Sequence, residues 1–160
     1  MIKIIATLLT IFAFNLSHAK VNVGIILGFT GPIETLTPGM SAGAELAFNE
    51  AADSGKLLNG QSINIIKVDS TCVDSAAATS AAESLISQGV TAIMGADCSG
   101  VTGAVLSNVA VPNGVPMISP SATSPGLTTA PDNGLFFRTA PSDARGGEVL
   151  ADITSSRGIS

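Results

Sequence analysis

The sequence has no Trp, no Tyr, one His and two Cys among its 160 residues. The single histidine, His18, lies near the amino terminus, so residues 20–160 contain none. Without His, this part lacks the usual general base of Ser-His-Asp and Cys-His catalysis and the commonest zinc ligand. GxxxxGK[ST] and GxGxxG phosphate-binding patterns are also absent, and we expect no nucleophile elbow. We therefore expect neither an enzyme nor a metal or other cofactor.

Charged residues are also scarce, at 12% of the chain, and acidic residues outnumber basic ones by twelve to seven. No cluster of Lys and Arg occurs, so the chain lacks the basic surface that binds a phosphate backbone, and nucleic acid is not an expected partner. The apolar content of 46% and mean hydropathy of +0.49 are far from the composition of a disordered chain. The length corresponds to roughly one globular domain.

No apolar run is long enough for a transmembrane helix, which needs about 20 residues. The longest, at 4–16, follows the basic residue Lys3 and precedes the small-x-small sequence Ser17-His18-Ala19. This pattern predicts a signal peptide over residues 1–19 that is cleaved after Ala19. No Cys lies near position 20, so a lipid anchor is not indicated. We expect a periplasmic protein that begins near residue 20.

The two cysteines, Cys72 and Cys98, are expected in an oxidising compartment because of the export signal. Two Cys without His or a CxxC spacing make a poor metal site, and a nucleophilic Cys needs a base that the exported chain lacks. A Cys72–Cys98 disulfide is the favoured prediction.

Short apolar runs alternate with helical patterns along the chain. Five runs are typical of buried strands, at residues 21–29, 63–69, 91–95, 116–119 and 135–139. Four segments have helical spacing or capping signals, at residues 40–51, 74–89, 99–112 and 142–155. Ser99 is expected to cap the third helix, which the segment from Pro112 to Gly114 should break. The alternation predicts an α/β fold whose parallel sheet carries helices on both faces.

In such a sheet a ligand binds beyond the carboxyl ends of the strands, at the point where strand order reverses. This rule selects the loops at 30–37, 96–100 and 120–126. Ser99 offers a hydroxyl beside the free N–H groups of a helix start, which suits an anion, although an ordinary N-cap is the favoured interpretation of this position taken alone. The loop at 120–125 presents three hydroxyls between two prolines, and a plain Ser/Thr turn is the alternative there. Their adjacency favours one shared site.

Six segments in this order resemble the leucine/isoleucine/valine-binding protein family of bacterial ABC importers. They are TGP (30–32), GAELAFNE (43–50), VDSTC (68–72), GADCSG (95–100), ISPSATSPGLT (118–128) and FRTAPSD (137–143). The resemblance covers nearly all of residues 20–160. It implies a type I periplasmic binding protein with two α/β lobes, which closes on an amino acid and delivers it to a membrane permease.

The resemblance also implies roles for individual residues. Ser99 corresponds to a ligand carboxylate contact through hydroxyl and backbone N–H, and Thr123 to a contact with both the carboxylate and the ammonium. Ser121 corresponds to a backbone carbonyl contact with the ammonium, and Ala122 lies between these two in the loop. Cys98 lies in the site loop, which the family's disulfide tethers. The remaining expected ligand-binding residue is Leu36, where well-studied members carry an aromatic side chain.

Family members are more than twice as long, so the resemblance implies that residues 20–160 form the amino-terminal lobe, ending where the chain crosses to the second. The missing lobe is expected to supply the acidic partner of the ammonium. We expect a monomer that binds a branched-chain or other aliphatic amino acid. The alternatives are an amide or other small solute as the ligand, or a receptor's ligand-sensing ectodomain with the same fold.

Overall fold

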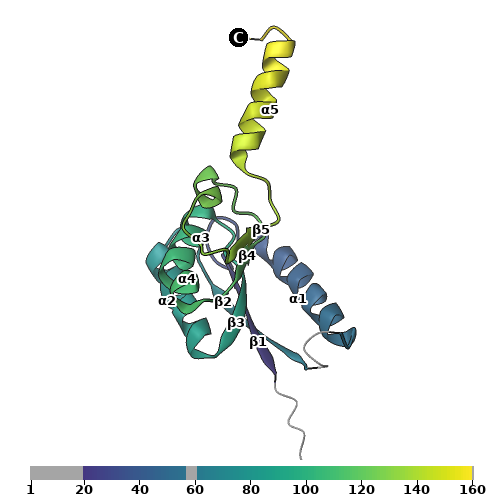
Figure 1. The fold of residues 1–160 in the computed structure, drawn as a ribbon, viewed down its shortest axis with the longest axis vertical. Helices are drawn as coiled ribbons and strands as arrows, with labels where there is room; N and C mark the ends of the chain where they lie inside the picture. Colours follow the sequence, from purple (N-terminus) through teal and green to yellow (C-terminus); the bar gives the residue numbers. More distant parts are fainter. Residues whose placement is uncertain (1–19, 57–60, 160) are drawn as a thin grey trace, which may run out of the picture.

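The computed structural model describes residues 20–56 and 61–159, and its centre is a five-stranded sheet in the order β2-β1-β3-β4-β5 (Figure 1). Every strand pairing is parallel, which confirms the predicted fold class. The strands are β1 Val21–Leu27, β2 Ile63–Asp69, β3 Val90–Gly95, β4 Met117–Ser119 and β5 Phe136–Arg138. The predicted signal peptide, residues 1–19, lies outside the described residues.

Helices follow four of the five strands. They are α1 Thr37–Asp53, α2 Ser75–Ser87, α3 Ser99–Val105 and α5 Asp143–Ser156, with the π-helical turn η2 Leu106–Ala110 and α4 Val111–Asn113 continuing α3, and the 3₁₀ turn η3 Pro125–Thr128 after β4. Asp74 caps α2 as predicted, because its side chain accepts hydrogen bonds from the backbone N–H groups of Ala76 and Ala77. Gly89 follows α2 with a φ of 72°, a conformation that glycine adopts without steric cost.

One helix-boundary prediction was wrong. The N-cap of α3 is Cys98, without a side-chain cap, and Ser99 is the first helical residue. The predicted break at 112–114 is confirmed, because the helix continues through α4 and ends at Gly114, which has a φ of 66°. The π-helical turn η2 immediately precedes α4. Its wider hydrogen-bonding pattern accommodates the ring of Pro112 and the N–H that proline lacks, both of which a regular α-helical turn disfavours.

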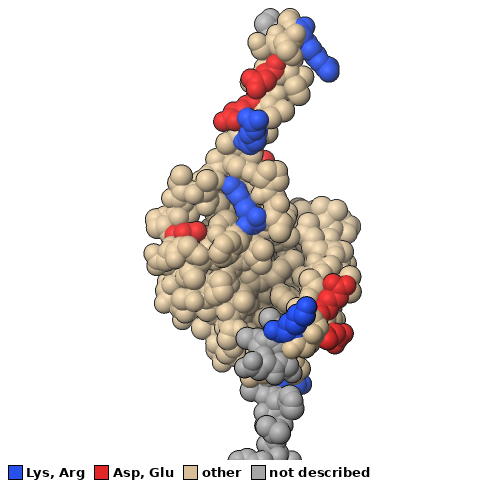
Figure 2. All heavy atoms as spheres, turned by 45° about the vertical axis from the view of Figure 1, so that its right-hand side comes forward, with Lys and Arg blue, Asp and Glu red and all other residues tan. Residues whose placement is uncertain are grey.

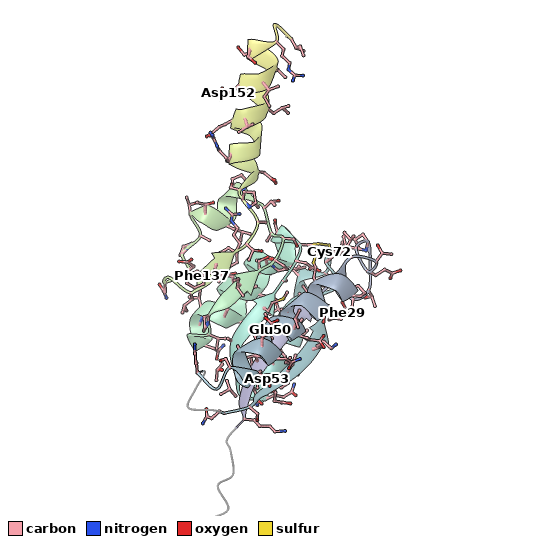
Figure 3. All side chains as sticks on the ribbon, turned by 90° about the vertical axis from the view of Figure 1, so that its right-hand side faces the viewer. Phe29, Glu50, Asp53, Cys72, Phe137 and Asp152 are labelled. Carbon is pink, nitrogen blue, oxygen red and sulfur yellow. A yellow bond between two sulfur atoms is a disulfide. The ribbon has the colours of Figure 1, made fainter. Side chains whose placement is uncertain are left out.

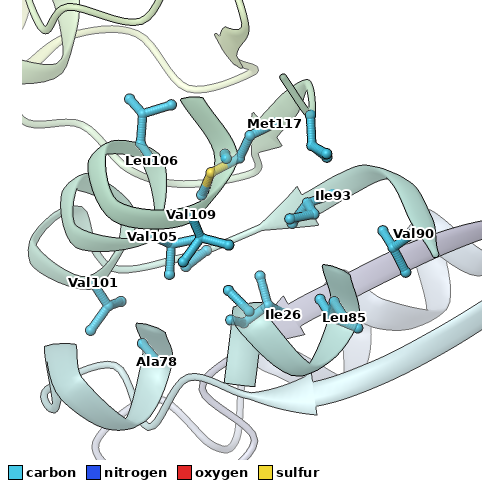
Figure 4. Close-up of a cluster of buried hydrophobic side chains, with 14 residues drawn as sticks. Ile26, Ala78, Leu85, Val90, Ile93, Val101, Val105, Leu106, Val109 and Met117 are labelled. Atoms are coloured by element: carbon cyan, nitrogen blue, oxygen red, sulfur yellow. The ribbon is translucent and has the colours of Figure 1, made fainter. Parts of the chain in front are cut away.

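The main core lies between the sheet and the helices α2 and α3 (Figure 4). Ile26, Ile93 and Met117 project from the sheet and are at most 1% exposed. They pack in one cluster with apolar side chains of the two helices and η2, namely Ala78, Ala82, Leu85, Val101, Val105, Leu106, Val109 and Ala110. We call this side the closed face.

The opposite side of the sheet, which we call the α1 face, is covered by one helix, α1, in the part of the chain that the structure describes. There Val23, Ile25 and Leu27 of β1 are buried. An ion pair of 2.9 Å between Lys67 Nζ and Glu45 Oε1 joins β2 to α1. The pKa of Glu45 is lowered by the hydrogen bond from the Ser41 hydroxyl and by Lys67, which keeps the carboxylate ionised.

Beyond α1 this face is open over β4 and β5, where Ile118 is 42% and Phe137 is 56% exposed. Figure 3 looks onto α1 and labels Phe137 to one side of it. A groove of about 260 Å³ runs between α1 and the sheet, lined by Ala44, Ala47, Phe48, Met94, Ile118, Pro120 and Thr139. The α1 face is therefore only partly covered.

Helix α5 projects away from the rest of the molecule (Figure 1) and contains no buried residue. Leu150 and Ile153 on this helix are 63% and 43% exposed. Figure 2 shows charges of both signs along α5 and only a few over the visible face of the body. The sheet and the other helical segments thus form the packed unit, and α5 leads out of it.

Candidate ligand-binding site

The strand order places the predicted loops at one edge of the sheet. β1 lies between β2 and β3, so the chain reverses its direction of progress across the sheet at β1. Because all strands are parallel, the loops that follow β1, β3 and β4 leave from the same edge. In α/β sheets this reversal point is where ligands bind.

Asp97 is the residue that organises these loops, and the sequence analysis did not identify it. Asp97 is 2% exposed, and its carboxylate accepts hydrogen bonds from three donors. The backbone N–H of Gly28 donates to Oδ2 at 2.7 Å, while the hydroxyl of Ser70 and the N–H of Cys98 donate to Oδ1 at 3.2 and 2.9 Å. These charge-assisted bonds offset the cost of burying a carboxylate, and they fix the loops after β1, β2 and β3 to one another.

The disulfide between Cys72 and Cys98 is present, with a Cα–Cα distance of 5.2 Å, which confirms that prediction. It links the loop after β2 to the start of α3. Because the sulfur of Cys98 is in the disulfide, this residue has no free thiol to offer a ligand.

Ser99 is half-buried at the first position of α3. Its Oγ accepts a hydrogen bond of 3.1 Å from the backbone N–H of Ser124, in the loop after β4. A hydroxyl that accepts in this way keeps its own O–H available as a donor. The N–H groups of the first helical turn lack intrahelical acceptors. This corner of the site therefore offers hydrogen-bond donors to an anionic group.

The loop after β4 is fastened to the loop after β3 from within. The buried Ser119 hydroxyl donates to the carbonyl of Ala96 at 2.5 Å and accepts from the N–H of Ala122 at 3.0 Å. The Ser121 hydroxyl donates to the carbonyl of Asp97 at 3.0 Å. Ala122 is 0% exposed, so its side chain is part of the interior. The side chains of both serines are thus engaged in holding the two loops together.

Arg138 and Asp143, which follow this loop in the sequence, complete its support, and neither was a predicted site residue. Arg138, at the end of β5, donates to the carbonyls of Ala122 and Ser124 at 3.2 and 2.9 Å. Asp143, at the start of α5, accepts a 2.8 Å hydrogen bond from the Thr123 hydroxyl and donates its own N–H to the Thr123 carbonyl at 3.0 Å. Both lie in the FRTAPSD segment, which is the signal that could have identified them.

The loop after β1 carries a second hydrogen-bonded cluster. Asp69 accepts from the hydroxyl and N–H of Thr30 at 2.5 and 3.3 Å, and from the N–H of Thr71 at 2.8 Å. Burial acts to raise the pKa of Asp69, but these hydrogen bonds outweigh it and the net pKa is lowered. The carboxylate thus remains ionised and holds the loop after β1 against β2.

Five of the six predicted ligand-binding residues come together, and one does not. Ser99, Ser121, Ala122 and Thr123 belong to one hydrogen-bonded pair of loops, with Cys98 at its base. Leu36 lies just before α1 and is 58% exposed. Within the described residues, no hydrogen bond joins it to this pair of loops. Its side chain is available to whatever lies over the loop after β1.

Other kinds of site find little support. The sequence GMSAG at 39–43 has the GxSxG spacing, but Ser41 lies inside α1 and donates to Glu45 at 2.7 Å, so it is not a nucleophile on a strand-to-helix turn. Among residues 20–56 and 61–159, no three His, Cys, Asp or Glu side chains are grouped to hold a metal ion. None of the described helices is both long and apolar enough to cross a membrane.

Comparison with known proteins agrees with this architecture. A family model described as periplasmic binding protein matches residues 20–160. The chain is 33% identical over 149 residues to the Leu/Ile/Val-binding protein BraC3 of Rhizobium johnstonii, an alignment that covers 91% of this chain and 39% of that protein. The chain therefore belongs to the periplasmic binding protein family, and it spans about two fifths of the length of this relative.

Solved structures share the fold. The substrate-binding protein LivJ of a branched-chain amino acid transporter from Streptococcus pneumoniae, in complex with isoleucine, matches with a TM-score of 0.69 and 31% identity over 78% of this chain and 35% of its own. A solute-binding protein of an ABC transporter from R. palustris, in complex with benzoate, matches with a TM-score of 0.74 and 28% identity over 88% and 38%. Membership of this binding-protein family agrees with the expectation that the chain is not an enzyme.

Proposed function

We propose that residues 20–160 are the amino-terminal lobe of a two-lobe periplasmic solute-binding protein, and that the lobe binds a small aliphatic amino acid for an ABC importer. The observation that carries the proposal is the hydrogen-bonded pair of loops after β3 and β4. It brings Ser99 and Thr123 to one edge of the sheet, where the strand order reverses. The relatives named above support the ligand class and the transport role.

The ligand carboxylate is held by hydrogen bonds rather than by a cation. The nearby guanidinium of Arg138 is occupied by the carbonyls of Ala122 and Ser124 and by Thr128 Oγ1. The Ser99 hydroxyl and the first-turn N–H groups of α3 are the available donors, and together they replace the water that a carboxylate loses on binding. No covalent bond is made or broken, and release requires only that the site open.

The second lobe closes the site in this proposal. Helix α5, which has no buried residue, leads out of the packed unit toward that lobe. Closure of two lobes about a hinge would cover the ligand and give the permease a conformation to recognise. Leu36, exposed where the loop after β1 joins α1, then contacts the ligand side chain. Residues 1–19 act as the export signal that brings the protein to the periplasm, where it meets the membrane permease.

Isothermal titration calorimetry of the two-lobe protein tests this site. Leucine, isoleucine, valine, alanine and benzoate form the ligand panel. Ser99→Ala is expected to weaken amino-acid binding by about 10-fold to 100-fold, because it removes a hydrogen bond to a charged group. Ser107→Ala on the outer surface of the same helical segment is the matched control, since its hydroxyl bonds only to the carbonyls of Gly103 and Ala104.

The results separate the proposed ligand from its rivals. Unchanged affinity in Ser99→Ala contradicts the site assignment. Binding of benzoate without binding of any amino acid reassigns the ligand class to aromatic carboxylates, as in the R. palustris protein. A membrane span beyond the second lobe in the complete gene would favour the receptor ectodomain over the importer component.

A further inference from the structure

The hydroxyl groups of Ser99 and Thr123 play opposite hydrogen-bonding roles within the lobe, one as an acceptor and the other as a donor. Ser99 Oγ accepts from the N–H of Ser124, so its own proton is free to be donated. Thr123 Oγ1 donates its proton to Asp143 Oδ2 at 2.8 Å. An ionised carboxylate can only accept, so the Thr123 proton is committed to Asp143 and the lone pairs of Oγ1 remain for another donor.

Asp143 is held in the position that this polarity needs. Its N–H donates to the Thr123 carbonyl at 3.0 Å, so the same two residues are joined by a second hydrogen bond. Asp143 is also the first residue of α5, whose N-cap Ser142 accepts from the N–H of Ala144 at 3.3 Å. A negative charge in the first turn of a helix is favoured by the helix dipole. The carboxylate is therefore tied to Thr123 through backbone and side chain together.

The loop itself is fixed on both sides of Thr123. Arg138 holds the carbonyl of the preceding residue, Ala122, and that of the following residue, Ser124. The backbone on both sides of Thr123 is therefore fixed, which keeps the Thr123 hydroxyl within hydrogen-bonding distance of Asp143.

We propose that Asp143 is a positioning residue that fixes Thr123 Oγ1 as an acceptor for a ligand ammonium group. The inference rests on the proposed function, in which the ligand carries both a carboxylate and an ammonium. Ser99 then donates to the anionic end and Thr123 accepts from the cationic end. Asp143 acts through Thr123 to favour an amino acid over a carboxylate that lacks the amino group.

The test compares L-leucine with 4-methylpentanoate, which has the same carbon skeleton without the ammonium. Calorimetry on the two-lobe protein, with the weaker ligand titrated to millimolar concentration, gives the ratio of the two affinities. Asp143→Ala is expected to weaken leucine binding about 10-fold or more and to leave 4-methylpentanoate within about 2-fold. Thr123→Val is expected to do the same. Asp152→Ala, which removes an exposed acidic side chain from the same helix, is the control for charge and folding.

Because Asp143 acts through Thr123, the double variant Asp143→Ala/Thr123→Val is expected to be no weaker for leucine than Thr123→Val alone. Equal weakening of both ligands by Asp143→Ala overturns the proposal, since it indicates a general structural role. Full additivity in the double variant also overturns it, since Asp143 then acts independently of Thr123. A wild-type protein that binds benzoate and 4-methylpentanoate as tightly as leucine overturns the role of Asp143 but leaves solute binding intact. No binding of any panel ligand overturns the proposed function itself.

Discussion

On the closed face of the sheet, Ile26, Ile93 and Met117 are at most 1% exposed, whereas Ile118 and Phe137, on neighbouring positions of the α1 face, are 42% and 56% exposed. The residue types do not explain this difference, because both sets are apolar. The helices do. A helix is about 10 Å wide and strands are about 4.8 Å apart, so one helix covers roughly two strands. The closed face has α2 and the segment α3-η2-α4, and the α1 face has one helix.

The strongest test of this contrast is a matched pair of truncations. Leu85→Ala removes a fully buried side chain from the closed face and should lower the free energy of unfolding by about 3 to 5 kcal/mol. Ile118→Ala on the open part of the α1 face should cost less than about 1 kcal/mol, because that side chain is already largely in water. Urea denaturation of both variants in the same protein measures the difference. Equal losses would show that the α1 face is covered in solution.

A smaller loss is expected from the disulfide, which joins the loop before α2 to the N-cap of α3 and so ties together the leading ends of the two helices on the closed face. Replacing both cysteines by Ser should lower the free energy of unfolding by about 2 to 4 kcal/mol, mainly by freeing the unfolded chain. Denaturation with and without reductant checks this. The wild type should lose stability in reductant, and the double variant should be indifferent to it.

The smallest effect is expected at Asp69, where the loop after β1 meets β2. Its folded pKa is lowered, so its contribution to stability is present above the unfolded pKa of about 3.9 and is lost as the pH falls through the folded value. Asp69→Asn should therefore make the free energy of unfolding fall less steeply below about pH 4. Denaturation curves from pH 7 to pH 2 provide the measurement. A slope identical to that of the wild type would show that the carboxylate is not held by Thr30 and Thr71 in solution.

Much of the fold was predictable because its signals are local. Buried strands of a parallel sheet are continuous apolar runs, and all five were found within a few residues of their ends. β1 ends two residues before its predicted limit because the N–H of Phe29 turns back to the carbonyl of Leu27. The helix from Ser99 was found, but its cap was placed one residue late. A pattern of residue types does not distinguish a capping serine from a first-turn serine whose hydroxyl is used elsewhere.

The candidate site was predictable in part. Ser99 and Thr123 were identified because hydroxyls after strands are a local pattern, reinforced by a family resemblance. Asp97 was missed because its partners Gly28 and Ser70 lie 69 and 27 residues away in sequence, and its role arises only when three loops meet. The same is true of Arg138 and Asp143, which support a loop that precedes them by many residues. The role of a residue that supports a site without lining it depends on tertiary contacts, which the spacing of residues along the sequence does not show.

Leu36 differs in its surroundings from the buried residues that hold the loops together. Its side chain is 58% exposed and forms no hydrogen bond, so this side chain contributes little to folding. Mutation at that position is consequently tolerated by the scaffold, while residues such as Asp97 and Ser119 are constrained by their buried partners. A substitution there would change the surface over the loop after β1 and leave the buried hydrogen bonds between the loops in place. Solved relatives that share this fold hold isoleucine in one case and benzoate in another.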